Sequence, residues 1–262
     1  MGANYAMPWQ FKQRSYELEN IDRGTYTPEE YDECIVELQR VNQWLGDARA
    51  VRHTLLRDIE NADLETFSVL DVGAGSGELL RVTAGWAQKT GRSAFLTGLD
   101  FNASMARALI DDSRQFPEIT SVRATAFQLP FADDQFDYVL SSLFTHHFTD
   151  TQVVELLREM GRVARRGICV VDLHRHPIAY YFYTTIGKLI LHNRLLRQDG
   201  ALSIRRSFKP DELLALARKA EIPGAYVERR FPYRIVLRAS LTRRELDSRR
   251  KDSSLGTTNK AA

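Results

Sequence analysis

The segment that most constrains the fold of this 262-residue chain runs from Val69 to Leu80 and reads VLDVGAGSGELL. An apolar run leads into three glycines at alternate positions, and an amphipathic helical pattern starts directly after them. Glycine permits the sharp turn and lets a ligand approach the backbone where a side chain would block it. The free N–H groups at the start of the helix favour an anionic or strongly polar ligand group. The segment therefore predicts a strand, a ligand-binding turn and a helix in immediate succession.

Short apolar runs and helical patterns alternate along most of the chain. The runs typical of strands cover residues 67–73, 93–100, 119–127, 136–144, 167–173, 226–231 and 233–239. Strands that alternate with helices require right-handed crossovers and form a parallel sheet covered on both faces. We therefore expect an α/β fold, a doubly wound Rossmann-like domain with a seven-stranded, mostly parallel sheet and an N-terminal helical lid.

Composition shifts along the chain suggest how it is divided. We expect an N-terminal helical lid over residues 1–61, in which Thr27 caps a helix that starts at Pro28. The main α/β domain should cover residues 62–242, with a substrate-cap insertion at 175–208. Residues 243–262 are polar and lack aromatic residues, which predicts a disordered tail.

Charge and cysteine content exclude several classes of protein. Lys plus Arg (36) nearly balances Asp plus Glu (34), and no basic stripe is visible, so we expect no nucleic-acid partner. The two distant cysteines favour a reducing compartment, and we predict a cytoplasmic location. The most apolar stretch, Ile178 to Leu191, is too short to span a bilayer, so we expect no stable membrane insertion. Nothing in the sequence predicts the oligomeric state.

The glycine spacing separates two kinds of nucleotide site. A dinucleotide fingerprint needs a third glycine where Glu78 stands, so the G-x-G-x-x-G pattern fails here. Asp100 follows the next strand, 29 residues after Asp71, and a carboxylate there can accept both hydroxyls of a ribose. The alternative is a purely structural strand-to-helix turn with an acid that caps the following helix.

The G-x-G-x-G spacing with Asp71 before it resembles the first motif of class I S-adenosylmethionine-dependent methyltransferases. The block AFQLPF at residues 126–131, followed by FDYV at 136–139, resembles the subgroup that includes the ubiquinone- and menaquinone-biosynthesis enzymes. The resemblance covers roughly residues 65–175. It implies that residues 62–242 are a methyltransferase domain with S-adenosylmethionine as its cofactor.

The resemblance also implies roles for individual residues. Asp71 would hold the ammonium group of the cofactor, Asp100 would bind the ribose, and a bulky residue after Asp100 would pack against adenine. The subgroup usually has an acid where Thr125 stands, which leaves the adenine contact less well defined. The candidate cofactor-binding residues are Asp71, Gly73, Gly75, Gly77, Asp100, Phe101, Met105, Thr125, Ala126, Phe127 and Ser141.

Four of the six histidines follow the two strands at 136–144 and 167–173. Histidine titrates near neutral pH, and we predict His146 or His174 as the base that takes a proton from the acceptor. Alternatively, these histidines cap helices or pair with Asp150 and Asp172. No histidine pair has metal-ligand spacing, so we expect no metal. The candidate substrate-binding residues are His147, His176, Tyr180 and Tyr181.

The sequence thus predicts an enzyme that methylates a small-molecule acceptor. The aromatic lid segments favour an aromatic or polyketide-like acceptor, methylated at a hydroxyl, in secondary metabolism. One alternative is C-methylation of a quinone precursor. Others are a non-catalytic methyltransferase-like binding protein and a nicotinamide-dependent oxidoreductase, which the position of Glu78 disfavours. A nucleic-acid methyltransferase is disfavoured because the N/D-P-P-aromatic run for a flipped base is absent.

Overall fold

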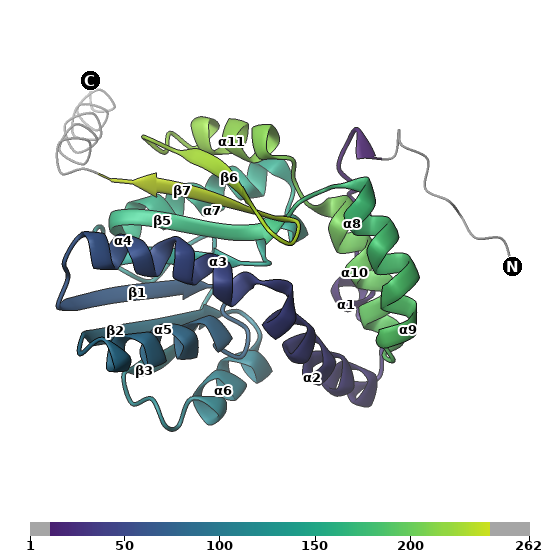
Figure 1. Ribbon diagram of the computed structural model, residues 1–262, viewed down its shortest axis with the longest axis horizontal. Helices are drawn as coiled ribbons and strands as arrows, with labels where there is room; N and C mark the ends of the chain where they lie inside the picture. Colours follow the sequence, from purple (N-terminus) through teal and green to yellow (C-terminus); the bar gives the residue numbers. More distant parts are fainter. Residues whose placement is uncertain (1–10, 242–262) are drawn as a thin grey trace, which may run out of the picture.

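A seven-stranded sheet forms the centre of the protein, as the sequence predicts (Figure 1). The structure is a computed structural model that describes residues 11–241. The strand order across the sheet is β3-β2-β1-β4-β5-β7-β6. The strands are β1 (Thr66–Val72), β2 (Ser93–Asp100), β3 (Ile119–Arg123), β4 (Phe136–Ser142), β5 (Ala164–Leu173), β6 (Tyr226–Arg230) and β7 (Arg234–Ser240).

The sheet is parallel except where β7 pairs with its two neighbours. Strands β1 to β5 pair in parallel, whereas β7 runs antiparallel to both β5 and β6. Strand β1 lies between β2 and β4, so the chain order reverses direction across the sheet at β1. In open α/β sheets, ligands bind at the carboxyl ends of the strands beside such a reversal. The end of β1 is where the glycine turn lies.

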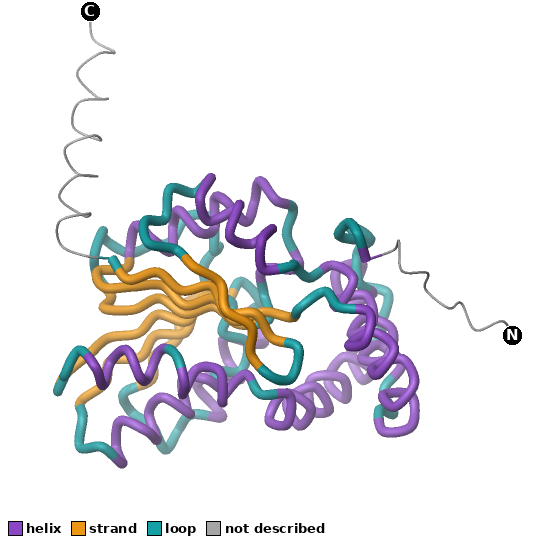
Figure 2. The backbone as a smooth tube through the Cα atoms, turned by 45° about the horizontal axis from the view of Figure 1, so that its top comes forward, coloured by secondary structure: helices purple, strands orange, loops and turns teal. Residues whose placement is uncertain are grey.

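Helices cover both faces of the sheet (Figure 2). On one face, α3 (Asp47–His53), α4 (Leu55–Asn61), α5 (Glu78–Lys89) and α6 (Ala103–Asp112) enclose an apolar core. On the other face, α7 (Asp150–Val163) and α11 (Pro210–Lys219) pack against the sheet. The core residues contributed by β1 alternate between the two faces: Val69 packs on the first and Leu70 on the second. This alternation is the pattern of a strand covered on both sides.

The remaining helices form one cap beyond the carboxyl ends of the strands (Figure 1). They are α1 (Asn20–Arg23), α2 (Pro28–Leu45), α8 (Pro177–Phe182), a π-helical turn (Tyr183–Gly187), α9 (Lys188–Ile190) and α10 (Arg194–Arg206). Cys34 of α2 packs with Leu191, Leu195 and Leu196 of the insertion. The expected N-terminal lid and the expected insertion at 175–208 are therefore two halves of one cap.

Helix α2 begins and ends where local sequence signals place it. The Thr27 side chain accepts a hydrogen bond from the backbone of Glu30, and Pro28 occupies the first turn. Gly46, which follows the helix, has the left-handed backbone (φ +91°) that favours glycine. These local signals fix the length of the helix, whereas its place in the cap depends on contacts with residues about 150 positions away.

The expected boundary between residues 61 and 62 does not divide lid from main domain. Helices α3 and α4 lie on the sheet, and Val51, Leu55 and Ile59 are almost completely buried against Phe67 and Val69. Burial of such side chains stabilises the fold by about 1.5–3 kcal/mol each. Residues 47–61 are therefore part of the core, and the cap begins with α1 and α2. The predicted tail at 243–262 lies outside the described residues.

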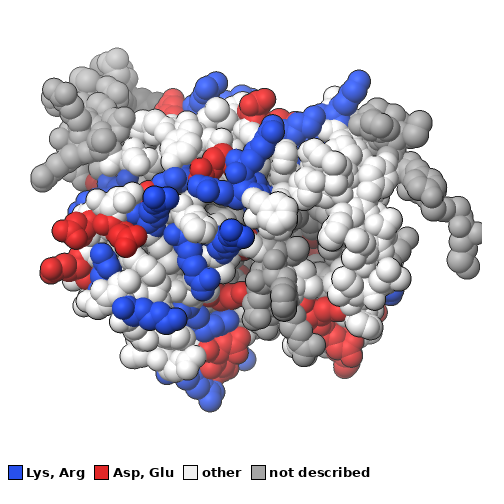
Figure 3. Space-filling view, viewed as in Figure 1, with Lys and Arg blue, Asp and Glu red and all other residues white. Residues whose placement is uncertain are grey.

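The outer face of α8 and α9 is apolar. Figure 3 shows charged side chains of both signs over the body of the molecule and a largely uncharged surface over these two helices. Leu189 is 83% exposed and Ile190 62% exposed. Within residues 11–241, each helix is too short or too polar to cross a bilayer.

Candidate active site at the carboxyl ends of the strands

The glycine turn after β1 has the sharp, left-handed backbone that its three glycines permit. Gly73, Gly75 and Gly77 have φ values of +75°, +52° and +80°, a region that residues with a Cβ rarely adopt. A Cβ on Gly73 would lie 2.5 Å from the ring of Phe144, and one on Gly77 would lie 2.8 Å from Leu109. At Gly75 nothing lies within 4 Å of that position. Side chains therefore pack closely against the turn at Gly73 and Gly77, and the turn is open at Gly75.

Asp71, two residues before the turn, carries a buried carboxylate oxygen without a partner. The residue is 3% exposed, and Oδ1 has no hydrogen-bond partner. Burial, together with the charge of nearby Asp100, raises the pKa of Asp71 to about 7. An unpartnered buried carboxylate is costly. A cationic ligand group beside Asp71 would remove this cost, and an ammonium group has the required charge and donors.

Asp100 ends β2 and holds the glycine turn in place. Its Oδ2 accepts a hydrogen bond from the backbone N–H of Gly75 at 3.0 Å, and its Oδ1 accepts one from Asn102 at 2.8 Å. Burial raises the pKa of Asp100, and these two hydrogen bonds oppose the shift. Each carboxylate oxygen can accept a further hydrogen bond. The arrangement leaves capacity for two hydroxyl donors, as a ribose offers.

The other predicted cofactor residues follow neighbouring strands. Phe101 is 70% exposed and follows β2, together with half-buried Met105. Thr125 is exposed and its hydroxyl accepts a hydrogen bond from the backbone of Phe127. The ring of half-buried Phe127 packs edge-on against Phe148, 5.0 Å between centroids. These residues offer flat apolar surface on the loops after β2 and β3, and buried Ala126 lies between Thr125 and Phe127.

Ser141 has a structural contact instead of an exposed hydroxyl. Its side chain is completely buried and donates to the carbonyl oxygen of Val72 at 2.8 Å. This bond joins the ends of β4 and β1 beside the glycine turn. The Ser141 hydroxyl is therefore not accessible to a ligand.

Of the two histidines predicted as the base, His146 is the one whose ring is oriented by a carboxylate. It lies in a short turn after β4 (Thr145–His147), and its Nδ1 is 2.7 Å from Oδ1 of Asp172 in β5. The hydroxyl of Thr145 and the backbone N–H of His146 donate to the other oxygen of Asp172. Burial favours a raised pKa for Asp172, but His146 and these hydrogen bonds bring it below its usual value. A carboxylate on Nδ1 holds the proton there and leaves Nε2 with its lone pair.

His174 and His176, after β5, form a separate pair with ring centroids 5.4 Å apart. Burial, followed by the charges of His176 and Arg229, lowers the pKa of His174 to about 4. His174 is therefore a weak base at neutral pH. The Nδ1 of His176 accepts a hydrogen bond from the backbone of Ile178 and so caps α8. That capping is the structural alternative to the predicted substrate contact.

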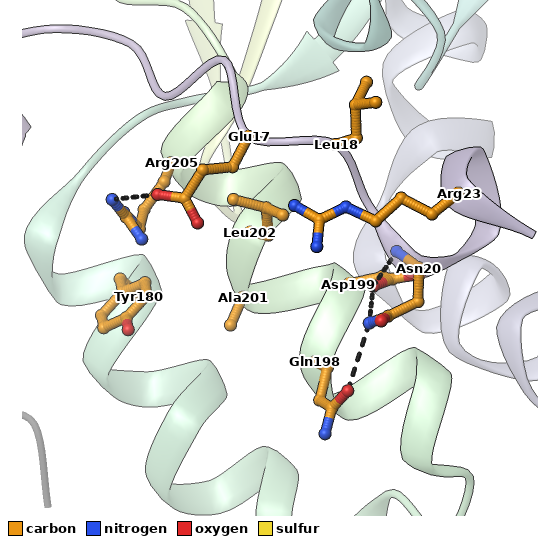
Figure 4. Close-up of a pocket in the computed structure, with 10 residues that line it drawn as sticks. All are labelled: Glu17, Leu18, Asn20, Arg23, Tyr180, Gln198, Asp199, Ala201, Leu202 and Arg205. Atoms are coloured by element: carbon orange, nitrogen blue, oxygen red, sulfur yellow. Dashed lines mark hydrogen bonds and ion pairs between the residues drawn. The ribbon is translucent and has the colours of Figure 1, made fainter. Parts of the chain in front are cut away.

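Tyr180 and Tyr181 pack on the N-terminal segment, with their ring centroids 5.4 and 6.4 Å from that of Phe11. Tyr180 also lines a pocket of about 280 Å³ between residues 17–23 and α10 (Figure 4). In this view Arg23 extends into the pocket, whereas Arg205 lies at its edge and pairs with Glu17 at 3.3 Å. None of its lining residues belongs to the strand ends. The pocket is therefore a feature of the cap, separate from the glycine turn.

Several charged residues outside the predicted site surround His146 and His147. The guanidinium of Arg14 contacts Asp150 at 2.6 Å and the carbonyl of Phe148 at 3.0 Å. Arg206 of α10 donates to the backbone carbonyls of both histidines. Glu19 is buried beside His147, and burial raises its pKa. Arg206 stands in a pair of basic residues with Arg205, whereas Arg14 and Glu19 belong to no motif, so no signal in the sequence marks those two.

The part of the chain that contains the glycine turn is similar to known proteins. A protein-family model for a methyltransferase domain matches residues 69–167. The chain is 33% identical over 121 residues to a demethylmenaquinone methyltransferase from Roseiflexus sp. (strain RS-1). That match covers 44% of this chain and 48% of the relative, so the chain spans about half the length of this curated relative.

Solved structures share the fold at low sequence identity. A SAM-dependent methyltransferase from Aquifex aeolicus is 14% identical, with a TM-score of 0.54, over 78% of this chain and 98% of its own. The plantazolicin methyltransferase BamL, solved with a triazolic desmethylPZN analog and SAH, is 16% identical, with a TM-score of 0.58. That match covers 76% of this chain and 71% of BamL.

Proposed function

We propose that this chain, which contains a methyltransferase domain of the class I S-adenosylmethionine-dependent type, transfers the methyl group of S-adenosylmethionine to a small-molecule acceptor. The observation that carries the proposal is the unpartnered buried oxygen of Asp71 beside an open glycine turn. The cofactor combines an ammonium group, a carboxylate and a ribose. Asp71, the backbone of the turn and Asp100 offer one partner for each of these groups.

Residues of this chain offer a contact for each part of the proposed cofactor. Asp71 would hold the ammonium group, the N–H groups of the turn at Gly75 and Gly77 the carboxylate, and Asp100 the ribose hydroxyls. Phe101, Met105 and Phe127 would pack on the adenine ring. When bound, the cofactor supplies an electrophilic methyl group. The protein then contributes mainly by holding the acceptor in line with that group and by excluding water.

We propose a hydroxyl of an aromatic or polyketide-like molecule as the methyl acceptor. Removal of the hydroxyl proton favours transfer, and His146, oriented by Asp172, is the group best arranged to assist it. His146 would take the proton from the hydroxyl through its Nε2. His174 has less support because of its low pKa. The aromatic side chains of the cap favour a flat acceptor.

A quinone precursor is the second candidate acceptor, methylated at carbon. The similarity to a demethylmenaquinone methyltransferase favours it and gives no support to a role in secondary metabolism. A non-catalytic binding protein remains the other alternative. The cytoplasmic location and the absence of a nucleic-acid partner stay predictions from the sequence.

The first experiment is calorimetric titration of the purified protein with S-adenosylmethionine and S-adenosylhomocysteine. We expect binding of both, a loss of at least tenfold in affinity in Asp100→Ala, and none in Asp112→Ala, an exposed acid in α6. Phenols and quinone precursors would then be offered with a methyl-labelled cofactor. NMR of the product separates oxygen from carbon methylation. A folded protein that binds neither ligand would overturn the proposal.

A further inference from the structure

Three side chains from distant parts of the chain place metal-binding atoms within 4.8 Å of one another: Glu19, His146 and His147. Glu19 precedes α1 in the cap, whereas the histidines follow β4 at the carboxyl edge of the sheet. We propose that this cluster binds a divalent transition-metal ion of the zinc type and so joins the N-terminal part of the cap to the loop after β4. Imidazole nitrogen and carboxylate oxygen are the ligands that such ions prefer.

The ring of His147 stands at the centre of the cluster. Its Nδ1 is buried and has no hydrogen-bond partner. It lies 3.9 Å from Oε2 of Glu19 and 3.5 Å from Oδ1 of Asp22, which is the nearest further ligand. A buried ring nitrogen between two carboxylates that are too distant for good hydrogen bonds is costly. An ion bound to all three groups would satisfy the nitrogen and both oxygens together.

Outer contacts hold His146, Glu19 and Asp22 by their other polar atoms. Asp172 occupies Nδ1 of His146, which leaves Nε2 as the donor for a metal. The hydroxyl of Ser203 donates to Oε1 of Glu19 at 2.8 Å, and Arg206 donates to Oδ2 of Asp22 at 3.0 Å. Carboxylate–histidine–metal and similar outer contacts are typical of metal sites, because they fix the tautomer and the orientation of the ligands.

The net charge around the cluster is negative, which favours binding of a cation. Three carboxylates surround it, those of Glu19, Asp22 and Asp172. They are opposed by the guanidinium of Arg206, which lies 3.8 Å from Oε1 of Glu19. The guanidinium of Arg14 reaches the carbonyl of His146, but its charge is paired with Asp150. With both imidazoles neutral, the carboxylates outnumber the opposing cation by two, and a divalent ion would balance this excess.

The ligand atoms need to move only slightly closer together to bind zinc. Zinc binds nitrogen and oxygen at ~2.0–2.1 Å, so ligand atoms of a tetrahedral site lie ~3.4 Å apart. Side-chain rotations of Glu19 and Asp22 can supply the difference from the present separations. With the ion bound, Nε2 of His146 is a ligand instead of a base. An acceptor hydroxyl that reached the ion would then lose its proton more readily. This last step alone rests on the proposed function.

The test is metal binding by the full chain after removal of metal with a chelator. Co²⁺ is titrated and followed by visible absorption, which reports the coordination geometry, and Zn²⁺ is titrated in competition. We expect one equivalent of Co²⁺ to bind and Zn²⁺ to displace it. His147→Ala and Glu19→Gln should each weaken the affinity by tenfold or more. His192→Ala is the matched control, because His192 is 91% exposed and distant from the cluster.

Two results would overturn the inference. One is the absence of stoichiometric Co²⁺ binding by the wild-type protein, which would mean that His147 only forms ion pairs with Glu19 and Asp22. The other is binding that neither variant weakens. Glu19→Gln keeps the shape of the side chain, so its folding can be compared directly by circular dichroism. S-adenosylmethionine binding, measured in parallel, separates failure of this inference from failure of the proposed function.

Discussion

At the scale of single residues, Asp71 occupies a position where folding alone would not favour an acid. A core position at the end of a central strand would be more stable with an apolar or fully hydrogen-bonded side chain. Asp71 instead keeps one buried oxygen unpartnered and a pKa of about 7. The ammonium group of the proposed cofactor, bound beside this oxygen, would restore the stability lost at this position. The residue therefore makes two opposite contributions, and both can be measured.

The first prediction concerns cofactor affinity and pH. Only the ionised form of Asp71 pairs with an ammonium group, so S-adenosylmethionine affinity should fall as the pH drops below about 7. The fall should approach tenfold per pH unit in the acidic range. Asp71→Asn should weaken binding by at least tenfold at pH 7.5 and flatten the profile. Calorimetry from pH 5.5 to 7.5 measures this, and an equally steep profile in the variant would assign the pH dependence elsewhere.

The second prediction concerns stability without cofactor. The folded-state pKa of Asp71 lies above its unfolded value, so folding is favoured by the bound proton. The contribution of Asp71 to stability therefore falls as the pH rises from about 4 towards 7. At pH 8, Asp71→Asn should raise the free energy of unfolding by on the order of 1–3 kcal/mol. Urea unfolding at pH 5 and pH 8 measures the difference, and a destabilised variant at pH 8 would contradict the assignment.

At the scale of elements, the start of α5 depends on a neighbouring helix as well as on its own sequence. Gly77 precedes α5 with a left-handed backbone, and Leu109 of α6 fills the space where a side chain would lie. The three glycines therefore have different roles. Gly73 and Gly77 permit close packing against Phe144 and Leu109, whereas Gly75 leaves its surroundings open for a ligand.

The third prediction compares two glycines of the same region. Gly77→Ala combines φ +80° with a Cβ 2.8 Å from Leu109, and it should destabilise the protein by about 2–4 kcal/mol. Gly85→Ala, inside α5, meets nothing within 4 Å and should stabilise by up to ~1 kcal/mol. Denaturant midpoints of the two variants test the pair. Similar midpoints would show that the turn accommodates the Cβ of Gly77→Ala without a loss of stability, which would contradict this prediction.

At the scale of the whole molecule, buried arginines fasten the cap to the sheet. Arg175, which follows β5, is 1% exposed and donates to the carbonyls of Phe11 and Ser207 and to the Glu212 carboxylate. Arg14 and Arg206 make similar contacts to the loop after β4. These bonds join the N-terminal segment, α10 and the strand ends. The cap is therefore held by polar contacts at its base and by an apolar cluster between its helices.

The fourth prediction tests this fastening. Arg175→Met should lower the free energy of unfolding by about 2–4 kcal/mol, because buried carbonyls lose their donors. Hydrogen exchange should accelerate in residues 11–16, where Phe11 and Lys12 accept from Arg175. Arg218→Met, at an exposed position of α11, is the control and should change stability by less than about 0.5 kcal/mol. Unchanged exchange in residues 11–16 would show that other contacts hold the segment.

The sequence by itself determined the α/β order, the seven strands and the glycine turn. Period-2 and period-3.6 patterns, turn glycines and helix caps act within a few residues, and each constrains the local backbone strongly. Local patterns also explain why Asp71 and Asp100 can be predicted from the sequence as candidate cofactor-binding residues. Each stands at a fixed offset from a strand end, and parallel strands bring their carboxyl ends to one edge.

Only the tertiary structure decided which groups meet around His146. Glu19 lies 127 residues before His146 and Arg206 lies 60 residues after it, and no periodicity relates either residue to the histidines. Tertiary packing also places α3 and α4 in the core, whereas the sequence predicts that residues 47–61 belong to the lid. Local backbone preferences can be predicted from neighbouring residues, but the meeting of distant polar side chains depends on the packing of the complete chain.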